Sequence, residues 1–251
     1  MINGKTDLVW KHAMRIAALT DIHAASDPLQ LALTAARREG FDAMLIMGDL
    51  LTYGVQPLET LELVHGAAAR DGAILIKGNH DLLYQSSAMA SAYRADLPDW
   101  LRESVDWTAA HIPAGSMSAF DWCESWSTGT LFAAHANPFV FGDWRYIRSA
   151  QEAEEAAETL AGRGFLYGLF GHVHRQRRYD CAAATIFTLA SLGQPRDDRD
   201  RTPKWAMIEI SGDCVNVETR DIDFDPEDQM HAIRASTLSA TTQERLCRFF
   251  A

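Results

Sequence analysis

Five apolar runs in this chain of 251 residues each end in a cluster of residue types that bind metals. The clusters are Asp21-Ile22-His23, Gly48-Asp49, Gly78-Asn79-His80-Asp81, His135 and Gly171-His172-Val173-His174. Their donor atoms are carboxylate oxygens, imidazole nitrogens and one amide oxygen, without a thiolate. This donor set suits Mn, Fe, Zn, Co or Ni better than a Cys-rich structural zinc site.

The number of ligands indicates two divalent metal ions rather than one. The candidate ligands are Asp21, His23, Asp49, Asn79, His135, His172 and His174. All of them on one ion would leave no open position, whereas two ions that share a carboxylate each keep room for water and substrate. Asp49 is the natural bridge. Such a pair activates water for attack on a phosphoester, so we predict a two-metal phosphoesterase site.

The motif Gly78-Asn79-His80-Asp81 is the most specific of the five. A given tetrapeptide occurs by chance in a chain of this length on the order of once per thousand, whereas Gly-Asp alone usually marks a turn. The competing interpretation is that these polar residues only cap strand ends and bind no metal. The fixed order of all five clusters favours the metal site.

The order of the five motifs resembles that of the calcineurin-like metallophosphoesterase superfamily. Residues 48–54 and 191–197 are also similar to segments of its small bacterial YfcE-like phosphodiesterase branch, so the resemblance spans nearly the whole chain. Two positions differ. Ala24-Ala25 follow the first motif where relatives often have Gly-Asn, and no Arg follows Gly48-Asp49 as it does in the phosphoprotein phosphatases.

The resemblance implies a role for each motif residue. Metal one would be held by Asp21, His23, Asp49 and His174, and metal two by Asp49, Asn79, His135 and His172. His80 would be catalytic, as an imidazolium that stabilises or protonates the leaving oxygen. Asp81 would orient His80 by a hydrogen bond to its far ring nitrogen.

Residues near the motifs are candidates for substrate contact. Tyr53 and Asn137 are pocket candidates, and arginines that follow the ligand loops could contact a substrate phosphate. These arginines are Arg145, Arg148, Arg175 and Arg177. The competing interpretation is that they are solvated surface residues, which is the usual state of exposed arginines.

The leading function is hydrolysis of phosphodiesters or small phosphorylated metabolites, such as nucleotides, by a metal-bridged water. Two other activities stay open: hydrolysis of dinucleoside polyphosphates of the Ap4A type, and dephosphorylation of phosphoproteins. The alternative to an enzyme is a catalytically silent scaffold of the same fold. The motifs do not separate the first two because pocket walls choose the leaving group.

Composition limits the partners and the location. A net charge of −11 argues against nucleic-acid binding, which depends on clustered Lys and Arg. The four Cys have no CxxC spacing, and no apolar stretch approaches the roughly 18 residues of a membrane span. Residues 1–7 lack the apolar core of a signal peptide. We expect a cytoplasmic protein, and the oligomeric state stays open.

Apolar patterning predicts alternating strands and helices, which is typical of an α/β fold. The predicted strands are 15–20, 43–47, 73–77, 130–134 and 165–170. The predicted helices are 28–38, 57–69 and 151–160. Each predicted strand leads into one of the five ligand clusters, so the clusters can converge at one edge of the sheets.

The rest of the chain predicts additions to this core. Residues 84–126 form a helical insertion rich in aromatic residues, which either packs on the sheet, as we favour, or acts as a lid. An antiparallel meander of 185–190, 205–210 and 215–219 implies a second sheet, and a helical tail begins near 225. We predict a single domain over 1–251, and the resemblance implies two face-to-face sheets flanked by helices (αββα).

Overall fold

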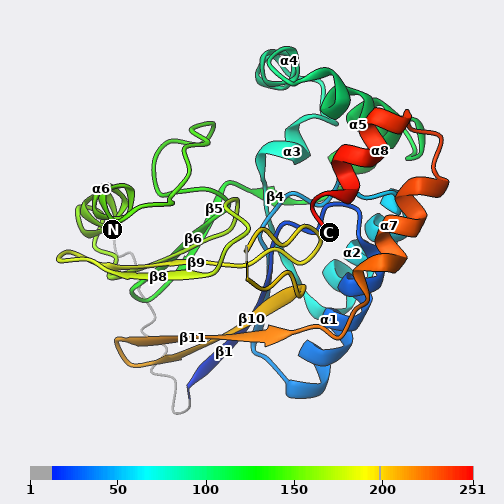
Figure 1. The fold of residues 1–251 in the computed structure, drawn as a ribbon. Helices are drawn as coiled ribbons and strands as arrows, with labels where there is room; N and C mark the ends of the chain where they lie inside the picture. The colour runs from blue at the N-terminus through cyan, green and yellow to red at the C-terminus, as the bar shows by residue number, and fades with distance from the viewer. Residues whose placement is uncertain (1–12, 198, 251) are drawn as a thin grey trace.

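The computed structural model describes residues 13–197 and 199–250, so the predicted absence of a signal peptide in 1–7 lies outside the described residues. Two β-sheets form its centre (Figure 1). The first has six strands in the order β11-β10-β1-β2-β3-β4. Its strands are β1 (Met14–Leu19), β2 (Ala43–Ile46), β3 (Ile74–Ile76), β4 (Trp122–Cys123), β10 (Lys204–Ser211) and β11 (Cys214–Asp221). Strands β1 to β4 run parallel, and β10 and β11 form an antiparallel hairpin against β1.

The second sheet has five strands in the order β5-β6-β7-β9-β8. Its strands are β5 (Ser125–Thr128), β6 (Leu131–Ala134), β7 (Tyr167–Phe170), β8 (Arg177–Asp180) and β9 (Thr185–Thr188). Strands β6, β7 and β9 are parallel, and the two edge strands are antiparallel to their neighbours.

The side chains of each central strand alternate between two apolar cores. Ile16 and Ala18 pack between the sheets with Leu131 and Leu169 of the second sheet. The intervening residues of β1 belong instead to a core under helices α1 (Ser26–Glu39) and α2 (Pro57–Asp71). Because strand side chains alternate in direction, a buried strand with helices on one side must be apolar on both faces.

Helix α6 (Ala150–Ala161) covers the outer face of the second sheet through Ala153, Ala157 and Leu160. The order of layers is therefore helices, sheet, sheet, helix, which confirms the predicted αββα architecture. Within 13–197 and 199–250, no helix combines the length and apolar character needed to cross a membrane.

The predicted antiparallel meander is right for its last two strands, because β10 and β11 pair antiparallel, and wrong for its first strand. β9 lies in the second sheet, parallel to β7, whereas β10 and β11 extend the first sheet beyond β1. Local apolar patterning predicts each strand, but it does not indicate which sheet the strand joins, because pairing depends on contacts that are distant in sequence. Strand β8, whose sequence Arg177–Asp180 is mostly charged, was not predicted.

The segment 84–126 is helical over most of its length but ends in strands β4 and β5. Its helices are α4 (Ala88–Ala95), α5 (Asp99–Ala110) and the 3₁₀ helix η1 (Ser116–Ala119). Tyr93, Trp100 and Trp107 share a core with the C-terminal helices α7 (Pro226–Ala235) and α8 (Ala240–Cys247). Phe120 and Trp122 instead pack in the core under α1 and α2, and Trp126 packs between the two sheets. The expected packing of the aromatic residues on the sheets therefore holds for the end of the segment and is wrong for its helices.

Candidate metal centre

The predicted ligand clusters converge where strands end. β1, β2 and β3 are parallel neighbours in one sheet, and β6 and β7 are parallel neighbours in the other. Each of these strands ends within four residues of a predicted ligand, in the order Asp21, Asp49, Asn79, His135 and His172. The carboxyl ends of parallel strands share one edge, which is why residues distant in sequence meet.

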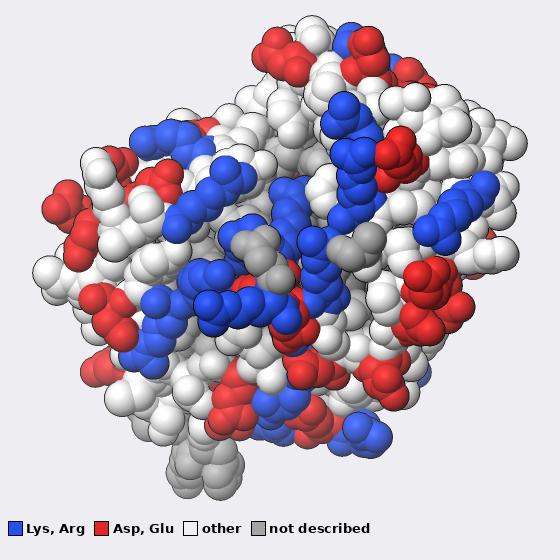
Figure 2. Space-filling model, viewed as in Figure 1, with Lys and Arg blue, Asp and Glu red and all other residues white. Residues whose placement is uncertain are grey.

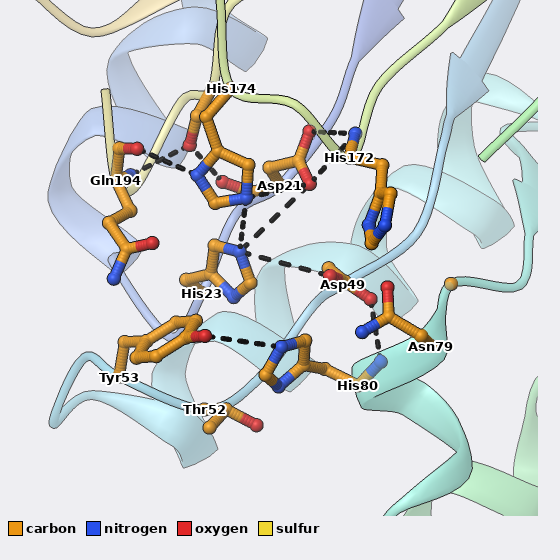
Figure 3. Close-up of polar contacts among 12 residues, drawn as sticks. Asp21, His23, Asp49, Thr52, Tyr53, Asn79, His80, His172, His174 and Gln194 are labelled. Carbon is orange, nitrogen blue, oxygen red and sulfur yellow. Dashed lines mark hydrogen bonds and ion pairs between the residues drawn. The ribbon is translucent and has the colours of Figure 1, made fainter. Parts of the chain in front are cut away.

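The ligand side chains form two buried groups (Figure 3). Asp21, His23 and His174 place their ligand atoms within 4.8 Å of one another, and so do Asp49, His135 and His172. These groups follow the two predicted ligand sets. The Asn79 Oδ1 lies 3.1 Å from the His135 Nε2, which places the amide oxygen in the second group.

Asp49 lies between the two groups. Its Oδ2 is 3.9 Å from the His23 Nε2 and 3.4 Å from the His135 Nε2. Its Oδ1 accepts a hydrogen bond from the His80 backbone N–H at 2.8 Å. One carboxylate oxygen is thus fixed by the chain, and the other faces a ligand of each group, as a bridging carboxylate requires.

The four imidazoles are oriented by backbone carbonyls. One ring nitrogen of each bonds to a carbonyl oxygen, which leaves the other nitrogen for the site. The pairs are His23 Nδ1 with Leu51 O at 3.1 Å, His135 Nδ1 with Met47 O at 2.7 Å, His174 Nδ1 with Gln194 O at 2.7 Å, and His172 Nε2 with Trp144 O at 2.9 Å. This outer contact fixes the tautomer that presents a lone pair, as in metal-ligating histidines.

The protonation states of the first group suit cation binding. Burial raises the pKa of Asp21, but the neighbouring His174 and His135 outweigh this effect and lower the pKa below its usual range, so the carboxylate is ionised. Burial lowers the pKa of His23 and of His174, so both rings are neutral near pH 7. Their two Nε2 atoms lie only 3.2 Å apart, and two neutral lone pairs at that distance repel unless a proton or cation lies beside them.

The second group shows the same demand for positive charge. Burial lowers the pKa of His135, but the carboxylates of Asp49 and Asp21 outweigh it and raise the pKa to about 10. Burial also lowers the pKa of His172, to about 3, so this ring is neutral. His135 therefore carries a proton near pH 7, and a divalent cation beside Asp49 could supply the positive charge that this proton provides.

The backbone of the ligand loops is strained. Five of the predicted ligands have left-handed φ angles, which non-glycine residues rarely adopt. They are Asp21 (52°), His23 (50°), Asp49 (54°), His172 (66°) and His174 (58°). Each such residue costs on the order of 1–3 kcal/mol, and strain of this kind clusters at functional sites.

The glycines of two motifs allow their loops to touch. A Cβ on Gly48 would lie 2.5 Å from the Gly78 nitrogen, and the φ of Gly48 is 87°. A Cβ on Gly78 would overlap the Asp49 carboxylate. Side chains at these positions would separate Asp49 from Asn79, so the glycines are required by close backbone approach.

Asp81 holds these same two loops together. Its carboxylate accepts hydrogen bonds from the backbone N–H groups of Asp49 and Gly78, both at 2.8 Å, and of Leu50 at 2.9 Å. The predicted hydrogen bond from Asp81 to the His80 ring is therefore wrong. The His80 Nδ1 is buried without a hydrogen-bond partner among the described residues. The Asp81 carboxylate instead accepts hydrogen bonds from three backbone N–H groups, and the spacing of residues in the sequence does not reveal these contacts.

His80 itself lies beside the two groups. Its ring centroid is 5.3 Å from that of His23, and its Nε2 is 3.3 Å from the Tyr53 hydroxyl. Burial, opposed by Asp49, lowers the pKa of His80 to about 4. The ring is thus neutral near pH 7, and the predicted imidazolium is wrong. Burial also raises the pKa of Tyr53 to about 12, which keeps its hydroxyl protonated.

The relation to known proteins agrees with this geometry. The family model of the calcineurin-like phosphoesterases matches residues 14–176, which include every predicted ligand. The chain belongs to the calcineurin-like phosphoesterase family. The predicted superfamily is thus confirmed, and membership of the YfcE-like branch stays a prediction.

Two solved structures share the fold over almost the whole chain. A metallophosphoesterase from Sphaerobacter thermophilus is 21% identical with a TM-score of 0.72, covering 94% of this chain and 99% of that one. A hypothetical protein from Pyrococcus horikoshii is 16% identical with a TM-score of 0.78, covering 93% and 97%. At these identities the likeness concerns the fold alone.

Curated relatives with higher identity are named as symmetrical bis(5'-nucleosyl)-tetraphosphatases. The protein from Pseudomonas entomophila is 30% identical, over 63% of this chain and 56% of its own length. The protein from Azotobacter vinelandii is 39% identical, over 37% of this chain and 33% of its own length. This chain therefore spans between a third and just over half of the length of these relatives.

The predicted substrate contacts lie at different distances from the centre. Tyr53 reaches it through His80. The Asn137 amide donates to the carbonyls of Asp143 and Arg145 at 2.8 and 3.0 Å, so it is occupied in shaping its own loop. The exposed Arg145 pairs with Asp143 and Glu155. Arg175 lines a cavity beside the centre.

Several residues near the centre were missed in the sequence. The Tyr93 hydroxyl, from α4, accepts a hydrogen bond from the Asn79 amide at 2.6 Å. Tyr146 stacks on the His172 ring with centroids 4.2 Å apart. The backbone N–H of Arg196 bonds to the carbonyl of His174. No local motif marks Tyr93 and Tyr146, whereas Arg196 lies within the resemblance segment 191–197 without having been assigned a role.

Proposed function

We propose that this chain is a metal-dependent phosphoester hydrolase that uses a pair of divalent cations. The convergence of two buried Asp and His groups on a shared carboxylate, Asp49, carries the proposal. Asp21, His23 and His174 would hold one ion, and Asn79, His135 and His172 the other. When bound, the ions lower the pKa of water and offset charge on phosphoryl oxygens. The N and O donors suit Mn, Fe, Zn, Co or Ni.

The chain contributes two neutral hydrogen-bond donors at the edge of this centre. The His80 ring and the Tyr53 hydroxyl lie 3.3 Å apart and are uncharged near pH 7. We propose that the neutral His80 ring donates a hydrogen bond to an oxygen of the reacting phosphoryl group, which stabilises charge as it develops there. Tyr53 then positions the His80 ring and shields it from water.

The burial of the site favours this electrostatic role. Asp21, His23 and Asp49 are each at most 1% exposed, so charges and dipoles act there with little screening by solvent. A cavity of about 270 Å³ reaches the site along His135, Asn137 and Trp144. It provides space for a small phosphorylated molecule beside the second ligand group.

The test is hydrolysis of a chromogenic phosphodiester and its matching monoester by Mn²⁺-loaded protein. We expect turnover of at least one of them, and a loss of at least about a hundredfold in Asp49→Asn, which removes the shared carboxylate charge. A wild-type rate equal to that of Asp49→Asn on both esters and on dinucleotides would support the silent scaffold. The ratio of diester to monoester rates separates the two ester classes.

A second candidate activity is hydrolysis of dinucleoside tetraphosphates. The curated relatives named as symmetrical bis(5'-nucleosyl)-tetraphosphatases favour it. The substrate would then be a nucleotide whose reacting linkage is a phosphoanhydride, attacked at the same centre. Nucleotide products separated by anion-exchange chromatography would identify the bond that is cleaved, and two nucleoside diphosphates would indicate symmetrical cleavage.

A further inference from the structure

A cavity lined by arginines adjoins the candidate metal centre. It has a volume of about 420 Å³, and its lining includes Arg148, Arg175, Arg177 and Arg196. Val173, which lies between the two ligands His172 and His174, forms part of its wall. The cavity and the candidate metal centre therefore share the loop after β7.

Further contacts connect the arginines to the metal ligands. The guanidinium of Arg148 lies 3.5 Å from the ring centroid of Tyr146, and Tyr146 stacks on His172 at 4.2 Å. Arg196 lies beside the other ligand group, where its backbone N–H donates a hydrogen bond to the carbonyl of His174 at 3.2 Å. Its guanidinium is 5.9 Å from the ring centroid of Tyr53. Positive charge thus reaches from the cavity to both ends of the centre.

Arg177 and Arg196 keep N–H donors for an anion. Arg177 bonds through one nitrogen to the Asp197 carboxylate at 2.9 Å and to the carbonyl of Gln176. Arg196 uses its Nε, at 3.0 Å, and one terminal nitrogen on the Gln194 amide oxygen. A guanidinium carries five N–H donors in a planar fork that suits phosphate oxygens, so neither residue is saturated.

The location of this charge is unusual for the chain. With a net charge of −11, an average surface patch is acidic. Even so, a band of Lys and Arg side chains crosses the middle of the face that carries the cavity (Figure 2). Concentrated positive charge in a hollow attracts and orients anions more strongly than scattered surface charge does.

We propose that the arginine cavity binds phosphate groups that neighbour the reacting one, so the preferred substrates are oligophosphates rather than isolated phosphoesters. This inference rests on the proposed function, because the candidate metal centre supplies the reaction. The cavity would hold the next phosphates of the chain while one phosphoryl group lies at the candidate metal centre. A small oligophosphate can lie within the cavity. The long backbone of a nucleic acid would also meet the acidic surface outside it, which would repel its phosphates.

Binding of inorganic tripolyphosphate to the protein in excess EDTA tests the cavity without activity. Isothermal titration calorimetry is expected to show binding that weakens about tenfold or more in Arg148→Gln and Arg177→Gln, since charge-assisted hydrogen bonds to phosphate are lost. Arg178→Gln is the matched control. It neighbours Arg177 on β8 but pairs with Asp180 and lies outside the cavity lining, so its affinity should stay within about twofold of wild type.

Two results would overturn the proposal. One is that Arg148→Gln, Arg177→Gln and Arg178→Gln bind tripolyphosphate with the same affinity, or that none of these proteins binds it. The other is equally tight binding of a single-stranded ten-nucleotide DNA, which would indicate a nucleic-acid site. Circular dichroism confirms folding of each variant, and both cavity arginines chosen are exposed.

Activity measurements separate this inference from the proposed function. With Mn²⁺-loaded protein, the kcat/KM for a dinucleoside tetraphosphate relative to that for a chromogenic diester should fall about tenfold in Arg177→Gln but not in Arg178→Gln. If both substrates are hydrolysed and the ratio of their kcat/KM values is unchanged in Arg177→Gln, the role of the cavity is refuted and the phosphoesterase activity is supported. If tripolyphosphate binds but neither substrate is hydrolysed, phosphate binding by the cavity is supported and the proposed phosphoesterase activity is refuted.

Discussion

Replacement of Asp81 tests whether its carboxylate fastens the two central ligand loops. In Asp81→Ala the backbone N–H groups of Gly78, Asp49 and Leu50 lose their acceptor in a fully buried position. Each buried donor left without a partner costs about 1–3 kcal/mol, so three of them suggest a loss of about 5 kcal/mol in the free energy of unfolding. For a chain of this size that loss lowers the Tm by roughly 10–20 °C.

Asp81→Asn should be much milder. The Oδ2 alone accepts the N–H groups of Gly78 and Asp49, and Oδ1 accepts that of Leu50. An amide placed with its oxygen at the Oδ2 position keeps two of the three bonds, so we expect a loss of about 2 kcal/mol. Burial, with Asp49 adding to the effect, raises the pKa of Asp81 to about 7. At pH 8.5 the Asp81 carboxylate of the wild type is ionised, so measurements at this pH compare both variants with the ionised form.

The assay is urea unfolding followed by tryptophan fluorescence, with the protein in EDTA so that metal affinity does not contribute. Asp180→Ala is the control, because Asp180 is an exposed carboxylate with one ion pair and should change stability by less than about 1 kcal/mol. If Asp81→Ala unfolds at the same urea concentration as Asp180→Ala, the three hydrogen bonds do not hold the loops and the argument is refuted.

Three other predictions concern catalysis, metals and packing. His80→Ala should lower kcat by about a hundredfold while metal analysis finds as many ions per chain as in wild type, because His80 lies beside the ligands without being one of them; a matching loss of metal would make it a ligand. Mn²⁺ at 100 times its Kd should raise the Tm by roughly 5–10 °C, an effect reversed by EDTA and absent in Asp49→Asn, whereas an equal rise in that variant would place the ion elsewhere. Gly193→Ala should destabilise the fold by about 1–3 kcal/mol, since its Cβ would overlap the carbonyl of Ile22, while Gly66→Ala has open space on a helix and should not lower stability in the same thermal melts.

The ligand positions could be predicted from sequence because each of them follows an apolar strand. Ile16 and Ala18 face one core and Ala17 and Leu19 the other, so the strand before Asp21 is apolar throughout and its end is visible. Strand ends in a parallel sheet share an edge, and this rule brings Asp21 and Asp49 together. His172 follows a strand of the other sheet, so its approach to Asp21 also requires the face-to-face packing of the two sheets. Within each sheet the prediction therefore needed only strand boundaries and residue types.

The contacts around the ligands could not be predicted in this way. Asp81 is adjacent to His80 in sequence, but two of its three partners are backbone N–H groups of Asp49 and Leu50, which lie 32 and 31 residues earlier. Tyr93 lies in a helical segment with many aromatic residues, and nothing in its spacing distinguishes it from Trp100 or Trp107. The sheet to which β9 belongs likewise depends on long-range pairing with β7, which local alternation does not encode.

The left-handed conformation of the ligand residues has a consequence for laboratory evolution of this protein. Glycine adopts such φ angles without strain, so selection for thermal stability alone would favour glycine at positions such as His23 and His174. Those replacements remove imidazoles that hold a cation, so variants chosen only for heat resistance would drift toward inert proteins. A screen that couples heat treatment to phosphoester hydrolysis would keep the strained loops and would select replacements away from the strand ends.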